Sequence, residues 1–289
     1  MTLGAALEGA LLRRFGVGVR SAERLSGGDI NDAFAVALAD GRRLFVKTNE
    51  RSPAGMFDAE ARGLAWLAEA RAVRLPEVLA VGGAGEPPYL ALELLSPGRR
   101  RPGFDEELGR GLAALHRAGA PSFGLDHDNF IGSLPQPNRR AATWLDFFRT
   151  ARLEPQLLLA VEGGRADAPL RRGFDRLFTR LAGLVGPAEP PCRLHGDLWA
   201  GNLHVDGQGA PCLIDPAAYA GHREMDLAMM RLFGGYSERT FAAYSEAFPL
   251  SPGVEERVGL YQLYPLMVHV NLFGGSYARQ VQGILDRYA

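Results

Sequence analysis

The sequence changes its periodicity once, near residue 95, and this change limits the folds that it can adopt. Before that point, apolar alternation and turn signals predict four strands, at 22–28, 33–39, 43–48 and 89–95. One helix is predicted among them, at 56–70. After the Pro- and Gly-rich stretch 96–103, the patterns become helical. We therefore predict an α+β chain in two parts, 1–95 and 96–289.

The second part is predicted to be mainly helical. Three amphipathic stretches predict helices, at 106–119, 142–160 and 170–186. The stretch 226–289 is also predicted to be helical and is rich in aromatic residues. One short hairpin interrupts this pattern, and it carries the most informative motif of the sequence.

Composition excludes several classes of function. The formal net charge is −1 and no basic block with interleaved aromatic residues occurs, so we expect no nucleic-acid partner. No apolar run of about 18 residues occurs, so we expect no membrane partner. The stretch 1–20 is predicted to form an ordinary helix, not a signal peptide. Cys192 and Cys212 cannot form a disulfide framework, and we expect a reducing, cytoplasmic location.

The hairpin motif reads HGDLWAGN at 195–202 and continues to IDP at 214–216. Two short strands joined by a Gly-containing turn are predicted between these two segments. We expect Leu203 to pair with Ile214. The residues just outside this pair would then lie opposite each other, about 5 Å apart at Cα.

Three side chains of this motif form a candidate chemical site. Asn202 and Asp215 would supply two oxygen donors to Mg²⁺, which is normally held by few protein ligands together with phosphate oxygens. Asp197, on the loop before the hairpin, could accept the proton of a hydroxyl group. The order matches the kinase pattern D-x-x-x-x-N followed by a metal-binding Asp. The alternative is a surface turn that is rich in Asp and Asn.

Lys47 is the only lysine among the 32 basic residues, and all the others are arginines. Alternation in the strand predicted at 43–48 places Lys47 on one face together with Phe45. On the following helix, Glu60 lies toward the buried side. That helix has its apolar stripe at Phe57, Ala61, Leu64 and Ala68. Lys47 and Glu60 can therefore form a phosphate-anchoring ion pair. The alternative is that Lys47 survived by chance in an arginine-rich chain.

Two further stretches of the first part can contact a nucleotide. Gly27 and Gly28, in SGGDIND, lie between two predicted strands, as a phosphate-covering loop would. A Gly-Gly pair by itself is usually just a turn. The backbone from Glu93 to Leu95, just before the linker, can offer hydrogen bonds to an adenine ring.

The motifs HGDLWAGN, IDP and GHREMDLAM resemble those of the fructosamine/ketosamine-3-kinase family. This family belongs to the aminoglycoside-phosphotransferase-like branch of the protein-kinase fold. The resemblance covers nearly the whole chain, because FVKTN, MFDAEARGLAWL, FGLDHDNFIGSLPQPN and YQLYPLMVHVNLFGG also fit it in order. The stretch DNFIGSLPQPN and the Trp of DLWAGN are the narrower match.

The resemblance implies a bilobal protein-kinase-like fold with a small β-rich N-lobe and a larger, mainly helical C-lobe. It also implies ATP, Mg²⁺ and transfer of the γ-phosphate to the 3-hydroxyl of a free or protein-bound ketosamine. Asp197 would be the base, and Asn202 and Asp215 the metal ligands. Lys47 and Glu60 would hold the phosphates.

The resemblance gives four further residues a role. His195 and Asp226 would support the catalytic loop, although Asp226 could equally be a helix N-cap. Trp199 could stack on a sugar ring, and His269 could line the acceptor site. A Trp or His among apolar residues is more often plain core. Some relatives carry a cysteine in the Gly-rich loop, and Asp29 stands here instead, so a redox-controlled disulfide through that loop is not expected.

Three rival functions remain open from the sequence. The first is a kinase of another small alcohol, such as an aminoglycoside or choline. An aminoglycoside site should be strongly acidic, whereas the helical part has many arginines beside its acids. The second is a pseudokinase, although every catalytic position is filled. The third is a metal hydrolase built on His195, His204 and His222, whose spacing matches no helix-borne metal motif.

Overall fold

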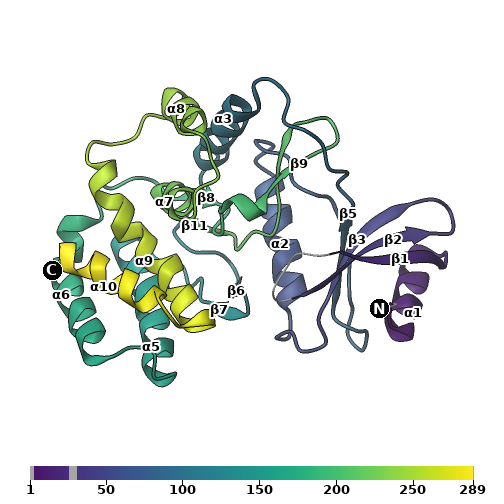
Figure 1. The fold of residues 1–289 in the computed structure, drawn as a ribbon, viewed down its shortest axis with the longest axis horizontal. Coiled ribbons are helices and arrows are strands. Elements are labelled where there is room, and N and C mark those ends of the chain that lie inside the picture. The colour runs from purple at the N-terminus through teal and green to yellow at the C-terminus, as the bar shows by residue number, and fades with distance from the viewer. Residues whose placement is uncertain (1–2, 26–30, 289) are drawn as a thin grey trace.

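The computed structural model describes residues 3–25 and 31–288, and Figure 1 shows a small sheet-containing part beside a larger helical part. Gly27, Gly28 and Asp29 lie outside the described residues. The two parts correspond to the α+β, bilobal arrangement that the sequence predicts.

The N-lobe sheet has five antiparallel strands within the described ranges, in the order β1-β2-β3-β5-β4. Their bounds are β1 Val19–Leu25, β2 Asp32–Leu38, β3 Arg43–Thr48, β4 Val78–Val81 and β5 Tyr89–Glu93. The four strands predicted from the sequence are confirmed, although the first begins three residues earlier than predicted and its predicted end, 26–28, lies outside the described residues. The prediction missed β4, because four residues are too few for a clear period-two pattern.

Two helices cover opposite faces of this sheet, as Figure 1 shows for α1 (Ala5–Phe15) on the outer side and α2 (Met56–Ala68) on the inner side. Leu44 and Val46 of β3 pack in the core that α1 completes. Phe45, the residue between them, packs on the α2 side. The alternation predicted for this strand is confirmed, and Lys47 lies on the inner face with Phe45.

The buried stripe of α2 differs from the prediction at one position. Phe57, Ala61 and Leu64 are buried as expected, but Ala68 is exposed. Leu67 is buried in its place, in a cluster that includes Leu115 and Ala218. Ala68 is the last residue of the helix. The last turn packs against the C-lobe instead of the sheet, because Leu67 clusters with residues of that lobe.

The C-lobe is mainly helical. Its uninterrupted helices are α3 (Phe104–Arg117), α6 (Ala168–Leu184), α7 (Glu224–Leu232), α8 (Glu238–Ala247), α9 (Val254–Phe273) and α10 (Tyr277–Tyr288). The stretch predicted as one helix at 142–160 is α4 (Trp144–Phe147), a π-helical turn at Phe148–Leu153, and α5 (Glu154–Glu162). The predicted helical character of 226–289 is confirmed over the described residues 226–288.

Within the described residues, three two-stranded sheets hold the ends of loops in the C-lobe. They are β6 (Asn129–Ile131) with β7 (Leu134–Gln136), β8 (Cys192–Leu194) with β11 (Tyr219–Gly221), and β9 (Leu203–Val205) with β10 (Pro211–Leu213). The segments that carry the hairpin motif therefore leave and enter short antiparallel ladders, which hold their ends.

The connection from β5 to α3 is bound along its length to the β9–β10 hairpin. Gly98 N–H donates to Val205 O, and Arg101 N–H donates to Gly209 O. The boundary predicted between residues 95 and 96 falls within this connection, and it stays a prediction.

Close packing of α3 on α8 makes one glycine sensitive to substitution. A Cβ on Gly109 would lie 2.3 Å from Thr240 O and 2.9 Å from Ala243 Cβ. We expect Gly109→Ala to lower the free energy of unfolding by about 1–3 kcal/mol, because overpacking forces the two helices apart. Urea denaturation measures this change.

Gly283 in α10 provides the matched control, because it is also helical and a Cβ there would meet no atom within 4 Å. We expect Gly283→Ala to raise stability by about 0.4–1 kcal/mol. Equal effects of the two substitutions would contradict the close α3–α8 packing.

Candidate active site

The hairpin of the motif pairs in a register one residue away from the prediction. Leu203 pairs with Leu213, not with Ile214. The turn decides this register, because the Asp206 carboxylate accepts hydrogen bonds from Gln208 N–H and Ala210 N–H, both at 2.9 Å. Asp215 therefore lies one residue beyond the position expected opposite Asn202.

Asn202 nevertheless lies against both acidic residues of the motif. Its Nδ2 donates to Asp197 O at 2.8 Å and to Asp197 Oδ2 at 3.1 Å. The same nitrogen lies 3.4 Å from Asp215 O, and Asn202 O accepts from Ile214 N–H. A short 3-10 helix at Ala200–Asn202 turns the chain so that these contacts form.

Lys47 joins strand β3 to helix α2 and to a distant segment of the C-lobe. Its Nζ lies 2.8 Å from Glu60 Oε1 on α2 and 2.5 Å from Asp215 Oδ1 in the C-lobe. The Lys47 side chain is 7% exposed and that of Asp215 is 43% exposed, so the pair lies at the inner wall of an open cleft. The predicted Lys47–Glu60 ion pair is present, and Asp215 is a second partner that the sequence did not indicate.

Burial changes the proton affinity of the groups in this cleft. Burial alone would lower the pKa of Lys47, but the Glu60 and Asp215 carboxylates outweigh it and raise that pKa, so the lysine is charged. Burial raises the pKa of Asp197 to about 7; the hydrogen bond from Asn202 opposes this rise, and the negative charge of Asp215 adds to it. A buried carboxylate with a raised pKa in a cleft is typical of a functional site.

A cavity of about 760 Å³ opens between the two lobes and brings these residues together. Its lining includes Lys47, Glu60, Asp197, Asn202 and Asp215. Trp199 and His269, which the sequence analysis assigned to the acceptor side, also line it. The structure thus gathers seven of the predicted site residues in one place.

An aromatic wall of the same cavity was not predicted from the sequence. The His269 ring lies 5.0 Å from the centroid of Phe233, 5.5 Å from Phe273 and 4.9 Å from Tyr277. Phe233 and Phe273 are 42% and 55% exposed, which is unusual for phenylalanines. The aromatic richness of 226–289 was the available signal, but it does not distinguish core rings from rings that line a cavity.

His195 and Asp226 support the loop that carries Asp197. The Asp226 carboxylate accepts from His195 N–H at 2.8 Å and from Gly196 N–H at 2.9 Å, and it also contacts His116 Nε2. His195 Nε2 donates to Ile214 O at 2.9 Å. Arg223, not Asp226, occupies the N-cap position of α7, so the N-cap interpretation is wrong.

Burial affects the pKa values of both residues, His195 and Asp226. Burial lowers the pKa of His195 and outweighs the charge of Asp226, so its ring is neutral. Burial alone would raise the pKa of Asp226, but the hydrogen bond and charge of His116 outweigh it and lower that pKa. A Cβ on Gly196, where φ is +82°, would lie 2.1 Å from Ala217 O, so the loop requires glycine there.

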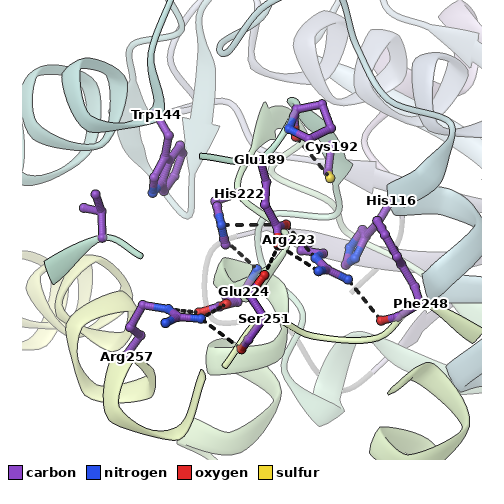
Figure 2. Close-up of polar contacts among 12 residues, drawn as sticks. His116, Trp144, Glu189, Cys192, His222, Arg223, Glu224, Phe248, Ser251 and Arg257 are labelled. Carbon is purple, nitrogen blue, oxygen red and sulfur yellow. Dashed lines mark hydrogen bonds and ion pairs between the residues drawn. The ribbon is translucent and has the colours of Figure 1, made fainter. Parts of the chain in front are cut away.

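Two buried ion pairs fix the start of α7, as Figure 2 shows. Arg223 binds Glu189 through two hydrogen bonds of 2.7 Å. Arg257 binds Glu224 through hydrogen bonds of 2.8 and 2.6 Å. Bidentate pairs of this kind restrain orientation as well as distance. They hold the first turn of α7, which carries Asp226, against α9 and against the connection between α6 and β8.

The remaining nucleotide-contact predictions gain no support from the described lining of the cavity. Gly27 and Gly28 lie outside the described residues. Glu93 and Leu95 are absent from the described residues that line the cavity. The Glu93 carboxylate pairs with Arg74 at 2.6 Å, and Glu93 N–H donates to Glu77 O. The adenine contact at Glu93–Leu95 stays a prediction.

The donor set of the cleft fits a hard cation that is shared with phosphate. The partly exposed carboxylate of Asp215 and the amide oxygen of Asn202 supply two oxygen donors, which is what Mg²⁺ takes beside phosphate oxygens. No group of three or more His, Cys, Asp or Glu that could hold a metal occurs within residues 3–25 and 31–288. His195, His204 and His222 therefore form no such group there.

In this chain, a strand lysine pairs with a helix glutamate, and a D-x-x-x-x-N loop faces them across a cleft. This combination defines the kinases of the bilobal protein-kinase-like fold. The chain is therefore a phosphotransferase. Residues 9–289 match the family model described as fructosamine kinase, and the chain belongs to this family.

Similar proteins carry related names. A protein of Enterococcus faecium named "Probable ketoamine kinase" is 39% identical over 263 residues, which cover 91% of this chain and 93% of that protein. The chloroplastic protein-ribulosamine 3-kinase of Arabidopsis thaliana is 38% identical over 271 residues, covering 91% and 81%. A solved structure from Thermobifida fusca, assigned to fructosamine-3-kinase, has a TM-score of 0.89 and 36% identity, and covers 99% of both chains.

The geometry around Lys47 predicts that arginine cannot replace it. Lys47→Arg keeps the charge, but a planar fork is wider than an ammonium group and prefers bidentate pairing with one carboxylate. Between Glu60 and Asp215, we expect the fork to displace the bound phosphates by about 1 Å, which can cost roughly 10²-fold in rate. The measurement is kcat/KM, with the melting temperature taken on the same preparation.

Arg43→Lys, an exposed exchange on the same strand, is the control and should leave kcat/KM unchanged. If Lys47→Arg keeps more than about half of the activity, Lys47 is a chance survivor and not an anchor. A large fall in melting temperature without nucleotide would instead indicate a structural role.

Proposed function

We propose that this chain transfers the γ-phosphate of ATP to a sugar hydroxyl of a ketosamine, in the manner of a fructosamine or ribulosamine 3-kinase. The observation that carries the proposal is the meeting of Lys47, Glu60, Asp197, Asn202 and Asp215 at one cavity, in a chain of the fructosamine kinase family. The names of the ketoamine and ribulosamine kinases to which the chain is similar support the acceptor class.

Each residue in the cleft has a role in this proposal. Asp197 orients the acceptor hydroxyl and takes its proton, because its carboxylate faces the cavity and Asn202 holds it in place. Asn202 and Asp215 would hold Mg²⁺, which supplies neutralisation of phosphate charge when bound. Lys47 would exchange its contact with Asp215 for phosphate oxygens while Glu60 keeps it in position.

The two lobes bind different substrates in this proposal. The nucleotide would bind mainly to the N-lobe, 1–95, with its adenine ring near Glu93–Leu95 and its phosphates under Gly27 and Gly28. The acceptor would bind to the C-lobe, 96–289, between Trp199 and His269. Both assignments rest on the resemblance of the motifs and on the position of the cavity between the lobes.

The lining of the cavity favours a ketosamine over an aminoglycoside. The acidic side chains among its described lining residues are Glu60, Asp197 and Asp215. In this proposal, all three belong to the end of the cavity where the phosphate is transferred. The acceptor end is formed by aromatic rings, which include Phe233, Phe273 and Tyr277. A polycation would need carboxylates there, whereas a sugar with one amine can stack on rings.

A cytoplasmic location is part of the proposal. It rests on the two cysteines, which are both free and buried, as expected for a protein of a reducing compartment. Within the described ranges, no helix is long and apolar enough to cross a membrane.

An acceptor screen tests the proposal directly. We expect ATP consumption with fructose-lysine or ribulose-lysine and none with kanamycin, because the described lining of the acceptor end has no carboxylates for a polycation. Choline is included in the screen as the other rival acceptor. Phosphate attached at the 3-hydroxyl, located by NMR of the product, completes the test. Turnover of kanamycin without turnover of either ketosamine would refute the proposed substrate class.

Asp197→Asn tests the proposed base. We expect kcat to fall by ~10²–10⁴-fold because the amide cannot accept the proton. Affinity for Mg·ATP should stay within about twofold, because Asp197 acts on the acceptor and not on the nucleotide. Asp58→Asn, exposed on α2, is the control and should match the wild type. An Asp197→Asn enzyme within about threefold of the wild-type kcat would remove Asp197 from the reaction.

A further inference from the structure

Arg152 is an unusual residue of the C-lobe because it is fully buried without a counterion. It is 0% exposed in the π-helical turn between α4 and α5, and none of the described carboxylates forms an ion pair with it. Its guanidinium donates to Pro137 O at 2.7 Å and to Asn138 Oδ1 at 2.7 Å. It also lies 3.8 Å from the ring centroid of Tyr219. Burying a charge without a counterion costs free energy of folding, so we expect Arg152 to have a role that offsets this cost.

Arg152 begins a chain of hydrogen bonds between buried amides. Asn138 Nδ2 donates to Asn129 Oδ1 at 2.8 Å, and Gln136 Nε2 donates to the same oxygen at 2.7 Å. Tyr264 OH donates to Gln136 Oε1 at 2.6 Å. We call these five residues, Arg152, Asn138, Asn129, Gln136 and Tyr264, the amide relay. Each of them is buried, and three lie in the DNFIGSLPQPN stretch, which the proposed reaction does not otherwise use.

The relay ends on the segment that follows Asp215. Gln136 Nε2 donates to Ala217 O at 3.1 Å, and Asn129 Nδ2 donates to Ala218 O at 2.8 Å. The ring on which Arg152 stacks belongs to Tyr219, the next residue. Three consecutive residues of the segment are therefore held by the relay.

The other side of Asp215 is held independently. Ile214 N–H donates to Asn202 O, and Ile214 O accepts from His195 Nε2. Asp215 itself has φ +55°, a left-handed conformation that is strained for a residue with a Cβ. Such a conformation persists only where the surrounding structure imposes it. Here, the fixed segments on both sides leave only Asp215 and Pro216 between them.

We propose that the amide relay positions the Asp215 carboxylate for the metal–nucleotide complex, with Gln136, Asn138 and Arg152 acting as positioning residues. This inference rests on the proposed function for the role of Asp215. The relay acts by restraining the backbone from Ala217 to Tyr219, so that its loss lets Asp215 relax from the strained conformation. The buried cation keeps the Asn138 amide oriented, with its oxygen toward Arg152 and its nitrogen toward Asn129.

Gln136→Met tests the relay without a large change in shape. The variant loses the donors to Ala217 O and Asn129 while it keeps the length of the side chain. Binding of a nonhydrolysable ATP analogue is measured by calorimetry, once with Mg²⁺ and once in EDTA. We expect affinity with Mg²⁺ to fall by about 10-fold, the lower end of the effect of losing a group that orients a metal ligand. Affinity in EDTA should stay within twofold of the wild type.

Gln156→Met is the matched control. Gln156 is equally buried in the same lobe, and its side-chain oxygen accepts from Asn271 Nδ2, which is not a residue of the relay. We expect the melting temperature to fall in this variant while both affinities stay unchanged. If Gln136→Met does not fold, Tyr264→Phe, which loses one hydroxyl group, should still weaken binding with Mg²⁺ about threefold and leave binding in EDTA unchanged.

Two results would overturn the inference. One is a folded Gln136→Met or Tyr264→Phe variant whose affinity with Mg²⁺ equals that of the wild type. The other is an equal loss with Mg²⁺ and in EDTA, which would mean general damage to the nucleotide site. The assay needs no acceptor, so a chain that phosphorylates no ketosamine would refute the proposed function and leave the relay result standing.

Discussion

The buried ammonium group of Lys47 is the interaction on which the cleft depends. It joins strand β3 and helix α2 through Glu60, and it joins both to the C-lobe through Asp215. Removing the ammonium group would leave the Glu60 carboxylate buried without a partner, which costs more than the pair contributes. The ion pairs therefore define the distance between the two walls of the cavity. They also keep Asp215 beside the position where phosphate would enter.

Buried polar groups hold the loop 195–202 from behind, in addition to the short ladders at its ends. Asp226 accepts two backbone N–H groups of the loop, and its own helix is fixed by the Arg223–Glu189 and Arg257–Glu224 pairs. The amide relay does the same for the segment after Asp215. Loops that carry reacting groups can be precise only when such partners satisfy and restrain their backbone.

Much of the fold and site could be predicted because the signals are local. Alternation in β3 and the single lysine of the chain indicated the inner face of the sheet, and the spacing from Asp197 to Asn202 indicated the loop. The register of the hairpin was predicted wrongly, because the Asp206 carboxylate inside the turn decides it by hydrogen bonds that spacing does not encode. Ala68 was misassigned because the last turn of α2 contacts the other lobe.

The sequence by itself determined which chemical groups are present and the order in which they occur: one lysine, one helix glutamate and an Asp–Asn–Asp motif. Only the tertiary structure decided that Lys47 contacts Asp215 across 168 residues of chain, and that Phe233, Phe273 and Tyr277 form one wall with His269. The physical reason is that periodicity reports which face of an element is buried. It does not report which distant element covers that face, because packing between elements depends on the whole chain.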